Sequence, residues 1–448
     1  MKCLIAKERT VHTSLRQRLR GLPPGFHLLM LSDVLSGLAM GAGYVSISWW
    51  VVSKGGANDM AWFSSCTALV MLAALPLTAP LGDRFPKNRI IAAGILLAML
   101  SGFALATMAW FDCYRLRWVI ASESLAMLAW ALVIPSMLSI ASELVPAERL
   151  TDALSLQKSS QAVGNLFGPV LGGSLMAFAP AWLALGSYGL LLLIAAGGAL
   201  RIRIPPRDRE QLQAESFVAQ IRSGLRIRWR IPLERSWACW GLLAMTAYFP
   251  MVVTLLPIKL HQLGLPAFWL GICEAAASGG LLIGSLWLAH RLLRRCSRPR
   301  ARALAMWSLA AVFVVVALTD NPYLMLTMFG IEGVLLSITM LIGQTHRTLA
   351  VPEAYRARVS AINVLVAKLG SMLGPALAGI LLHSWSLDAV YLFFAVFHLL
   401  SVPPMLRLPG VNAFLNLNHQ EVKDWYRHQY PEAFEPIVVA DAKLKQPV

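Results

Sequence analysis

One segment rich in glycine and proline occurs twice in this chain, 206 residues apart. The first copy consists of Gly164, Gly168, Pro169, Gly172 and Gly173. The second copy keeps the same register with Gly370, Gly374, Pro375, Ala378 and Gly379. The stretches before the two copies, beginning at Glu143 and Leu349, match at the same offset. The chain therefore consists of two related halves, and its fold must be built by duplication.

The composition places both halves in a lipid bilayer. Hydrophobic residues make up 57% of the 448 residues and charged residues only 14%, a balance that soluble domains of this length do not show. A membrane-spanning helix needs about 20 mainly apolar residues. This measure predicts twelve spans, at 26–52, 60–80, 90–110, 117–140, 153–178, 180–200, 237–258, 267–289, 303–319, 323–344, 358–383 and 387–406. The first span lacks the features of a cleaved signal peptide, so we expect it to be retained.

The basic residues alternate between the two sides of these spans. If both termini are cytoplasmic, 33 of the 39 Lys and Arg residues lie on the cytoplasmic side, four lie in outer loops and two lie within spans. Cytoplasmic loops of membrane proteins carry an excess of Lys and Arg. The distribution predicts an even number of spans, with both termini in the cytoplasm.

The repeat and the span count together predict an all-α membrane protein with twelve transmembrane helices in two pseudo-symmetric six-helix bundles. We expect a cytoplasmic N-terminal tail at 1–25, a first bundle at 26–200, a cytoplasmic linker at 201–236, a second bundle at 237–406 and a cytoplasmic tail at 407–448. The C-terminal tail contains no motif that indicates its role.

The linker contains a stretch with helical periodicity. Phe217, Ile221, Leu225 and Trp229 recur at helical spacing among four arginines. This pattern is typical of an amphipathic helix on the inner leaflet. A flexible linker whose arginines only set the topology explains it equally well.

Several classes of protein are disfavoured. The net charge of +16 does not indicate nucleic-acid binding, because the basic residues are scattered over short loops. The six cysteines form no C-x-x-C pair, so neither a disulfide framework nor a zinc site is indicated. A phosphate-binding loop and an H-E-x-x-H motif are both absent, which argues against an ATP-driven pump and a membrane protease. We expect no enzymatic activity, no cofactor and no metal.

Two motifs resemble those of the major facilitator superfamily. The residues that match its loop between helices 2 and 3 are Leu81, Asp83, Arg84 and Lys87. Ala79 and Pro86 stand where that loop has glycines, which affects the turn geometry more than the charge pattern because proline fixes φ. The first glycine–proline segment matches the antiporter signature associated with exporters in this family.

The resemblance covers nearly the whole chain and points to the branch that contains the enterobactin exporter and macrolide-efflux proteins. The stretches that carry it are 143–149, the amphipathic part of the linker, 270–274 and 348–358. It implies a monomeric, multi-pass protein of a bacterial cytoplasmic membrane, whose partners are the lipid bilayer, a small-molecule substrate and protons. It also implies a gating loop of Asp83, Arg84 and Lys87, with Asp83 approaching the inner end of span 11 near Arg358.

Six ionisable residues within the predicted spans are the candidates for ion coupling. A charge at a helix centre costs about 2.5 to 3.5 kcal/mol, so each of them needs a partner, a water-filled cavity or a task. The acids are Asp33, Glu123, Glu274 and Glu332, and the bases are Lys158 and Lys368. Similar depth predicts that Asp33 faces Lys158 and that Glu332 faces Lys368, which makes these two acids the preferred proton carriers. Pairs that only fix the helix packing are the alternative.

Amide side chains are the candidates for substrate binding. They are Gln157, Gln161, Asn165 and Asn363. Gln157 and Asn363 are related by the 206-residue offset, and each would bond either a substrate or a neighbouring helix.

Three functions fit the sequence. They are proton-driven export of an amphipathic molecule such as a siderophore or a hydrophobic antibiotic, uptake of a polar nutrient by symport, and a non-transporting receptor or scaffold. The antiporter signature favours export over uptake. Sugar uptake is disfavoured by largely apolar spans rich in Met, Phe and Trp, and a scaffold leaves the buried charges without a use. The residues do not select a compound.

Overall fold

The computed structural model describes residues 22–146, 149–203, 217–418 and 420–434, and these are almost entirely helical. Helices suit a lipid environment because they satisfy every backbone hydrogen bond within one segment. The first bundle consists of α2 (Pro24–Arg84), α3 (Lys87–Trp110), α4 (Leu116–Leu144), α5 (Leu150–Phe178) and α6 (Ala181–Leu200). The second consists of α8 (Pro232–Phe249), η2 (Pro250–Leu255), α9 (Leu256–Gln262), α10 (Phe268–Ile283), η3 (Gly284–Leu288), α11 (Ala289–Arg295), α12 (Arg298–Leu318), α13 (Pro322–Ala350), α14 (Glu353–Leu382) and α15 (Leu387–Leu406). The linker contributes α7 (Phe217–Arg230), and the tail contributes α16 (Val411–Asn416), α17 (Trp425–Gln429) and η4 (Pro431–Ala433).

The described residues contain six long helices before the linker and six after it. Ten stretches are long and apolar enough to cross a membrane. The stretch in α2 is two helices that meet at Gly56, whose φ of 74° and ψ of −164° suit a residue without a Cβ. The more polar α5 is the remaining long helix. The all-helical architecture predicted from the sequence is confirmed, and the observed ends lie within several residues of the predicted ones.

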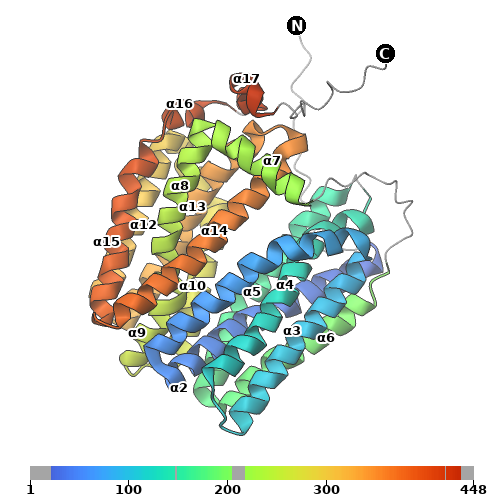
Figure 1. Cartoon of the computed structure of the whole chain (residues 1–448), viewed down its shortest axis with the longest axis vertical. Coiled ribbons are helices and arrows are strands. Elements are labelled where there is room, and N and C mark those ends of the chain that lie inside the picture. Colours follow the sequence, from blue (N-terminus) through green and yellow to red (C-terminus); the bar gives the residue numbers. More distant parts are fainter. Residues whose placement is uncertain (1–21, 147–148, 204–216, 419, 435–448) are drawn as a thin grey trace, which may run out of the picture.

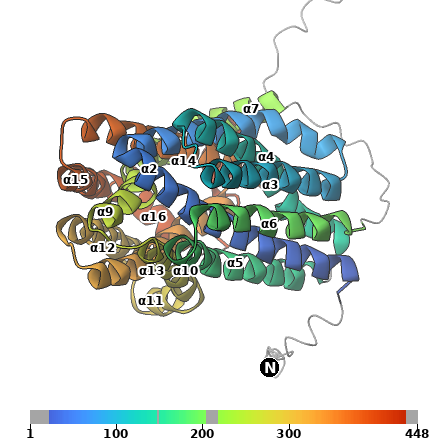
Figure 2. The ribbon, with the colours of Figure 1, turned by 90° about the horizontal axis from the view of Figure 1, so that it is seen from below.

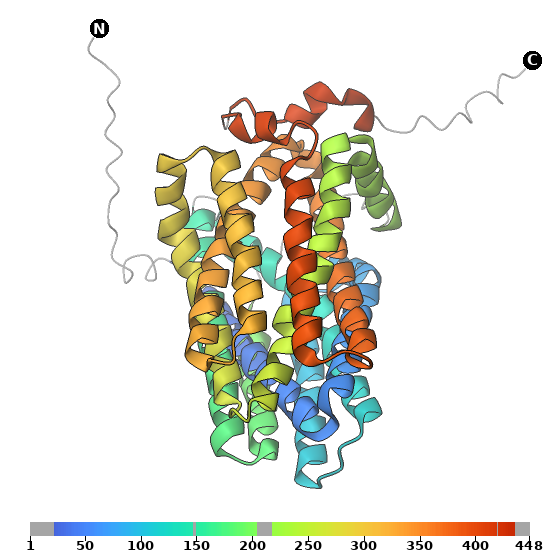
Figure 3. The same cartoon turned by 90° about the vertical axis from the view of Figure 1, so that its left-hand side faces the viewer.

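The helices form two bundles side by side (Figure 1). Seen at right angles, α10 lies next to α5 and α14 lies next to α2 where the bundles meet (Figure 2). We call the end of the molecule that carries α7, α16 and α17 the linker end, and the opposite end the far end. The tail segment crosses the linker end of the second bundle (Figure 3).

The first glycine–proline segment packs α5 against the first part of α2. A side-chain methyl at Gly164 would lie 2.7 Å from the Gly37 Cα, and one at Gly168 would lie 2.8 Å from the Leu38 carbonyl oxygen. Glycines 164, 168 and 172 line one helix face, and the sequence predicts that this face contacts a helix of the other half. That prediction is wrong, because the nearest atoms belong to α2 of the same bundle. Only the next face, at Gly173, meets the second bundle, where a methyl would lie 3.0 Å from the Gly271 Cα.

The second glycine–proline segment repeats this arrangement in α14. A methyl at Gly370 would lie 2.7 Å from the Met245 Cβ of α8, within the same bundle. Gly379, the counterpart of Gly173, faces the first bundle, where a methyl would lie 2.8 Å from the Ala61 Cβ. The repeat thus serves helix packing in both halves. One glycine face of each helix packs within its own bundle, and one further glycine, Gly173 or Gly379, contacts the other bundle.

Contacts between the bundles lie toward the far end. The rings of Trp49 and His261 meet edge to face with centroids 5.5 Å apart. The Asn58 and His383 side chains approach to 3.5 Å across the same end. Together with the Gly173–Gly271 approach, these contacts close the far end, while the ribbons of the two bundles diverge toward the linker end (Figure 1).

Candidate functional site

Two acids lie inside the second bundle, on the linker side of the far-end contacts: Glu332 is buried, and Glu274 is half-buried with its Oε1 atom shielded from solvent. Glu274 is three residues along α10 from Gly271, which packs against the Pro169 backbone. Glu332, on the neighbouring α13, is 2% exposed and lies close enough to Glu274 for the two carboxyls to interact electrostatically. Neither acid forms an ion pair with a described residue.

Tyrosines from both bundles surround these acids. The Tyr248 hydroxyl of α8 donates a 2.6 Å hydrogen bond to Glu332 Oε1. The Tyr44 hydroxyl of α2 lies beside the Glu274 carboxyl and 3.4 Å from the carbonyl oxygens of Val252 and Val253. We call Tyr44, Tyr248, Glu274 and Glu332 the carboxyl–tyrosine cluster. It joins the two bundles, and it can hold protons because ionising two carboxyls that repel each other inside a helix bundle is costly.

Sequence reasoning identified the acids of this cluster but not its tyrosines. Hydropathy singles out a charge within a span, whereas a tyrosine is ordinary in a membrane helix. The predicted ion pair between Glu332 and Lys368 is wrong: Glu332 accepts its hydrogen bond from Tyr248, and Lys368 forms no ion pair with a described residue. Equal depth on consecutive helices does not make two side chains face each other.

The predicted ion pair between Asp33 and Lys158 is also wrong. Asp33 is 2% exposed, whereas Lys158 is exposed. The buried oxygens of Asp33 find no hydrogen-bond partner among the described residues, and the amides of Gln157 and Gln161 are its polar neighbours. Residue 158 is one position further around the helix than Gln157, so its side chain leaves the face that meets α2.

The remaining predicted residues of the first bundle lie apart from the carboxyl–tyrosine cluster. Glu123 of α4 is 7% exposed and accepts a 3.3 Å hydrogen bond from the Ser101 hydroxyl. The Gln157 amide donates a 2.9 Å hydrogen bond to the Met137 carbonyl of α4, so Gln157 is bonded to a neighbouring helix. Gln161 is half-buried and Asn165 is exposed, and their predicted contact with a substrate stays a prediction.

A second polar network occupies the linker end of the second bundle. Arg347 of α13 forms two hydrogen bonds to Glu234 of α8, at 2.7 Å from Nε and 2.5 Å from Nη2. Glu234 is 1% exposed, and its Oε1 also accepts a 2.8 Å bond from the Tyr426 hydroxyl of α17. Two guanidinium groups lie over the Trp237 ring, with Arg347 4.7 Å and Arg302 4.4 Å from its centre. The buried carboxylate is thus fully bonded.

Asn363 belongs to this network and not to a substrate site. Its Oδ1 accepts bonds of 2.5 Å from Arg228 of α7 and 2.8 Å from Arg347. Burial, and then the neighbouring Arg347, lower the pKa of Arg228 to about 10. Burial, and then the Glu234 charge, raise the pKa of Tyr426 well above its usual range. We call Arg228, Glu234, Arg347, Asn363 and Tyr426 the linker-end network.

The linker-end network was missed by sequence reasoning for two reasons. Glu234 and Arg347 lie just outside the predicted spans, so they were counted as loop charges. The tail helices α16 and α17 have only six and five residues, too short to show periodicity. Two more hydrogen bonds hold the tail against the second bundle. The Tyr355 hydroxyl donates a 2.9 Å bond to the Phe434 carbonyl, and the Asp424 backbone amide donates a 3.0 Å bond to the Leu349 carbonyl.

The predicted gating loop is only partly visible. The side chains of Asp83 and Arg84 lie outside those that the structure describes, so the approach of Asp83 to span 11 stays a prediction. Lys87 forms a 2.6 Å ion pair with Glu143, which precedes α5. Arg358 Nη1 donates a 3.3 Å hydrogen bond to the Ser223 hydroxyl of α7.

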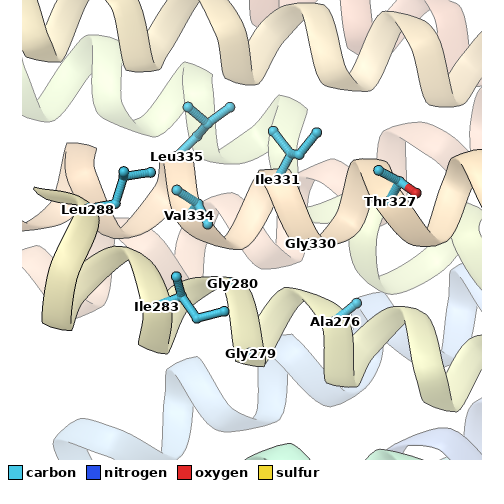
Figure 4. A pocket seen from close by; sticks show the side chains of 10 residues that line it. All are labelled: Ala276, Gly279, Gly280, Ile283, Leu288, Thr327, Gly330, Ile331, Val334 and Leu335. Atoms are coloured by element: carbon cyan, nitrogen blue, oxygen red, sulfur yellow. The ribbon is translucent and has the colours of Figure 1, made fainter. Parts of the chain in front are cut away.

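An apolar groove of about 590 Å³ runs between α10 and α13 (Figure 4). Its lining consists of Ala276, Gly279, Gly280, Ile283, Leu288, Thr327, Gly330, Ile331, Val334 and Leu335. Thr327 supplies its one polar side chain, and neither Glu274 nor Glu332 lines it. Its lining residues include no titratable side chain, so the carboxyl–tyrosine cluster is the better candidate site for proton coupling.

The fold and the buried acids fit a family whose model matches most of the chain. The Major Facilitator Superfamily model matches residues 29–314 and 275–416. The chain belongs to this superfamily. It is a secondary transporter, not an enzyme, and the resemblance of its two motifs to this family is confirmed at that level.

Two curated relatives of the transporter differ in what they carry. It is 25% identical over 405 residues to the multidrug efflux pump Tap of Mycolicibacterium fortuitum, covering 87% of this chain and 95% of the pump. It is 27% identical over 368 residues to a maltose permease of Geobacillus stearothermophilus, covering 78% and 84%. The identities leave the substrate of this transporter open.

Solved structures confirm the fold alone. The crystal structure of the nucleoside transporter NupG has a TM-score of 0.69 at 11% identity, covering 88% of this chain and 100% of that one. A bacterial homolog of the human lysosomal transporter Spinster, in an inward-facing and unoccupied conformation, has a TM-score of 0.60 at 14% identity, covering 91% and 98%.

Proposed function

We propose that this transporter exports a small amphipathic molecule from the cytoplasm in exchange for protons. The observation that carries the proposal is the pair of neighbouring acids, Glu274 and Glu332, on the linker side of the closed far end. With the far end closed, the pair faces the linker end, and opening the far end would turn it to the other side. A proton bound in one state is released in the other, which couples proton entry to export.

The surroundings of the cluster suit an amphipathic substrate. The Tyr248 ring packs edge to face on Phe313 with centroids 5.6 Å apart, and Tyr44 of the first bundle is close enough to interact with it electrostatically. Such sites combine a mainly apolar lining with a few polar groups. The similarity to a multidrug efflux pump and the antiporter signature in α5 support export. A siderophore or a hydrophobic antibiotic fits this description.

Sugar uptake is the second candidate function, because the similarity to the maltose permease is of comparable extent. The two candidate functions differ in the direction in which the substrate moves relative to the protons. In sealed inverted membrane vesicles, an exporter accumulates ethidium when a proton gradient is imposed, whereas a sugar symporter releases preloaded maltose. Ethidium accumulation without maltose transport supports export, and the reverse result would overturn it.

The acids are tested in the same vesicles. Glu332→Gln and Glu274→Gln should abolish proton-driven ethidium accumulation, whereas Asp152→Asn, a change at an exposed acid of α5, should not. Asp33→Asn and Glu123→Gln test the other two candidate proton carriers in the same assay. If both variants of the cluster still accumulate ethidium against a gradient, the cluster is not the proton carrier, and Asp33 or Glu123 takes its place.

The physiological compound requires a comparison in cells. Deleting the gene should change either the compounds secreted under iron limitation or the susceptibility to an antibiotic panel. Culture-supernatant analysis and growth assays measure the two effects. A deletion that changes neither removes the main support for export.

The linker end is proposed to be cytoplasmic. The excess of Lys and Arg on that side motivates the orientation. Reporter fusions after Ala57 and after Asn321 should report the outer face, and fusions after Asp208 and within the tail should report the cytoplasm. An inverted result at either outer site would contradict this topology.

A further inference from the structure

The linker helix α7 has one face buried against the second bundle. A methyl at Gly224 would lie 2.7 Å from the Arg358 carbonyl oxygen of α14, so the two helices approach closely. Ile227 is 2% exposed, and Arg228 is 3% exposed and bonded to Asn363. This face fixes the orientation of α7 relative to the second bundle.

The opposite face of α7 combines arginines with large apolar side chains. Leu225 is 51% exposed, Trp229 is 62% exposed, and Arg222 is exposed one turn before Leu225. Arg226 is half-buried beside them. The sequence of α7 contains no acidic residue, so the face is uniformly basic.

This face continues into the lipid-facing side of α8. The Arg235 guanidinium stacks 5.9 Å from the centre of the Trp229 ring. Arg235, Cys239 and Leu243 are all exposed at four-residue spacing, so they mark the outer side of a span. Trp229 therefore lies where the lipid-facing surface of the span begins, the depth that an indole ring prefers.

We propose that Arg222, Leu225, Arg226, Trp229 and Arg235, which we call the α7 surface, bind the headgroups of anionic phospholipids in the cytoplasmic leaflet. The proposal rests on the orientation proposed above. The arginines supply cations at headgroup depth, and Leu225 and Trp229 enter the boundary of the acyl chains. The matching charge and the continuity with the lipid-facing side of α8 favour a lipid over a soluble partner. Each arginine raises the affinity for an anionic surface about fivefold.

Binding is tested with the purified full-length transporter in a neutral detergent. Short-chain phosphatidylglycerol should raise the melting temperature more than phosphatidylcholine does, because a ligand of the folded state stabilises it. In the triple variant Arg222→Gln, Arg226→Gln, Arg235→Gln, the affinity for phosphatidylglycerol should fall about a hundredfold. Native mass spectrometry counts the bound lipids independently. None of these measurements depends on transport, so the proposed function can fail without affecting them.

A matched triple variant separates a specific surface from general charge. Arg294→Gln, Arg295→Gln, Arg300→Gln removes the same charge from exposed positions near the linker end of the second bundle. It should keep the preference for phosphatidylglycerol. An equal loss in both triple variants, or equal stabilisation of the wild type by the two lipids, would overturn the proposal. Stabilisation by glycerol phosphate alone would also overturn it, since it would indicate a site for free anions.

Discussion

The helices α5 and α14 are two copies of one design with different surroundings. Both pack a glycine face into their own bundle and turn one glycine, Gly173 or Gly379, toward the other bundle. At their linker ends the copies diverge. Gln157 in α5 donates a hydrogen bond to a neighbouring carbonyl, whereas its counterpart Asn363 joins a buried polar network from the linker, two helices and the tail.

This difference shows which features the two halves share through duplication and which features are found in one half alone. The repeated glycines build the two bundles and their contact near the far end. The ionisable groups do not repeat: the two acids that interact electrostatically are both in the second bundle, and so is the network that binds the tail. The glycine packing is therefore symmetric between the two halves, and the arrangement of the ionisable groups is not.

The largest expected effect is a loss of transport when the repeated glycines are replaced. Gly168→Leu and Gly374→Leu should each abolish transport, because a methyl there would lie 2.8 Å from the Leu38 carbonyl oxygen or 2.6 Å from the Pro250 Cδ. Transport in vesicles and insertion into the membrane are measured together. Gly197→Leu is the control, since a methyl at Gly197 meets nothing within 4 Å. Normal coupled transport by either variant would show that the repeat has no mechanical role.

A smaller but still large effect concerns the ion pairs of the two halves. Arg347→Met should reduce the free energy of unfolding by about 3 to 5 kcal/mol, because it leaves the buried Glu234 carboxylate without its partner. Lys87→Met, in the half-exposed pair with Glu143, should cost less than about 1 kcal/mol. Unfolding in mixed detergent measures both. Equal costs would mean that the two halves are equally bonded at the linker end.

The tail is expected to contribute an intermediate amount. Tyr426→Phe removes a hydrogen bond to the Glu234 carboxylate and should cost about 1.5 to 3 kcal/mol. Tyr355→Phe removes a bond to a neutral carbonyl and should cost about 1 kcal/mol. The same unfolding assay ranks the two variants. If Tyr426→Phe costs nothing, the tail contact does not stabilise the second bundle.

The smallest effect tests the one position where the glycine repeat is broken. Ala378→Gly restores the residue of the first copy and should cost only about 1 kcal/mol through the lower helix propensity of glycine, with transport retained. The reciprocal Gly172→Ala should impair transport, since a methyl there would lie 2.6 Å from the Ala42 Cα. Vesicle transport rates compare the two exchanges. If both variants transport at the wild-type rate, α5 and α14 have equal space for a side-chain methyl at this position.

Hydropathy and the repeat predicted the helices because both are properties of whole segments. The ends of α6 and α15 lie within one residue of the predictions. Which side chains meet depends on rotation about each helix, which depth along the chain does not determine, and the expected partners of Asp33 and Glu332 were wrong for that reason. The partner of Glu234 in α17 is 192 residues away in the chain and lies on a short helix, so no local pattern indicates it.

The attachment of α7 to the second bundle decides where this transporter can be divided into two separately expressed chains. The bonds of Arg228 and the close approach of Gly224 to α14 assign α7 to the second bundle, although it precedes α8 in the chain. A break placed N-terminal to Phe217 keeps this unit whole, and the two fragments should reassemble into an active transporter. A break at Ile231 would leave α7 on the wrong fragment, and complementation should fail.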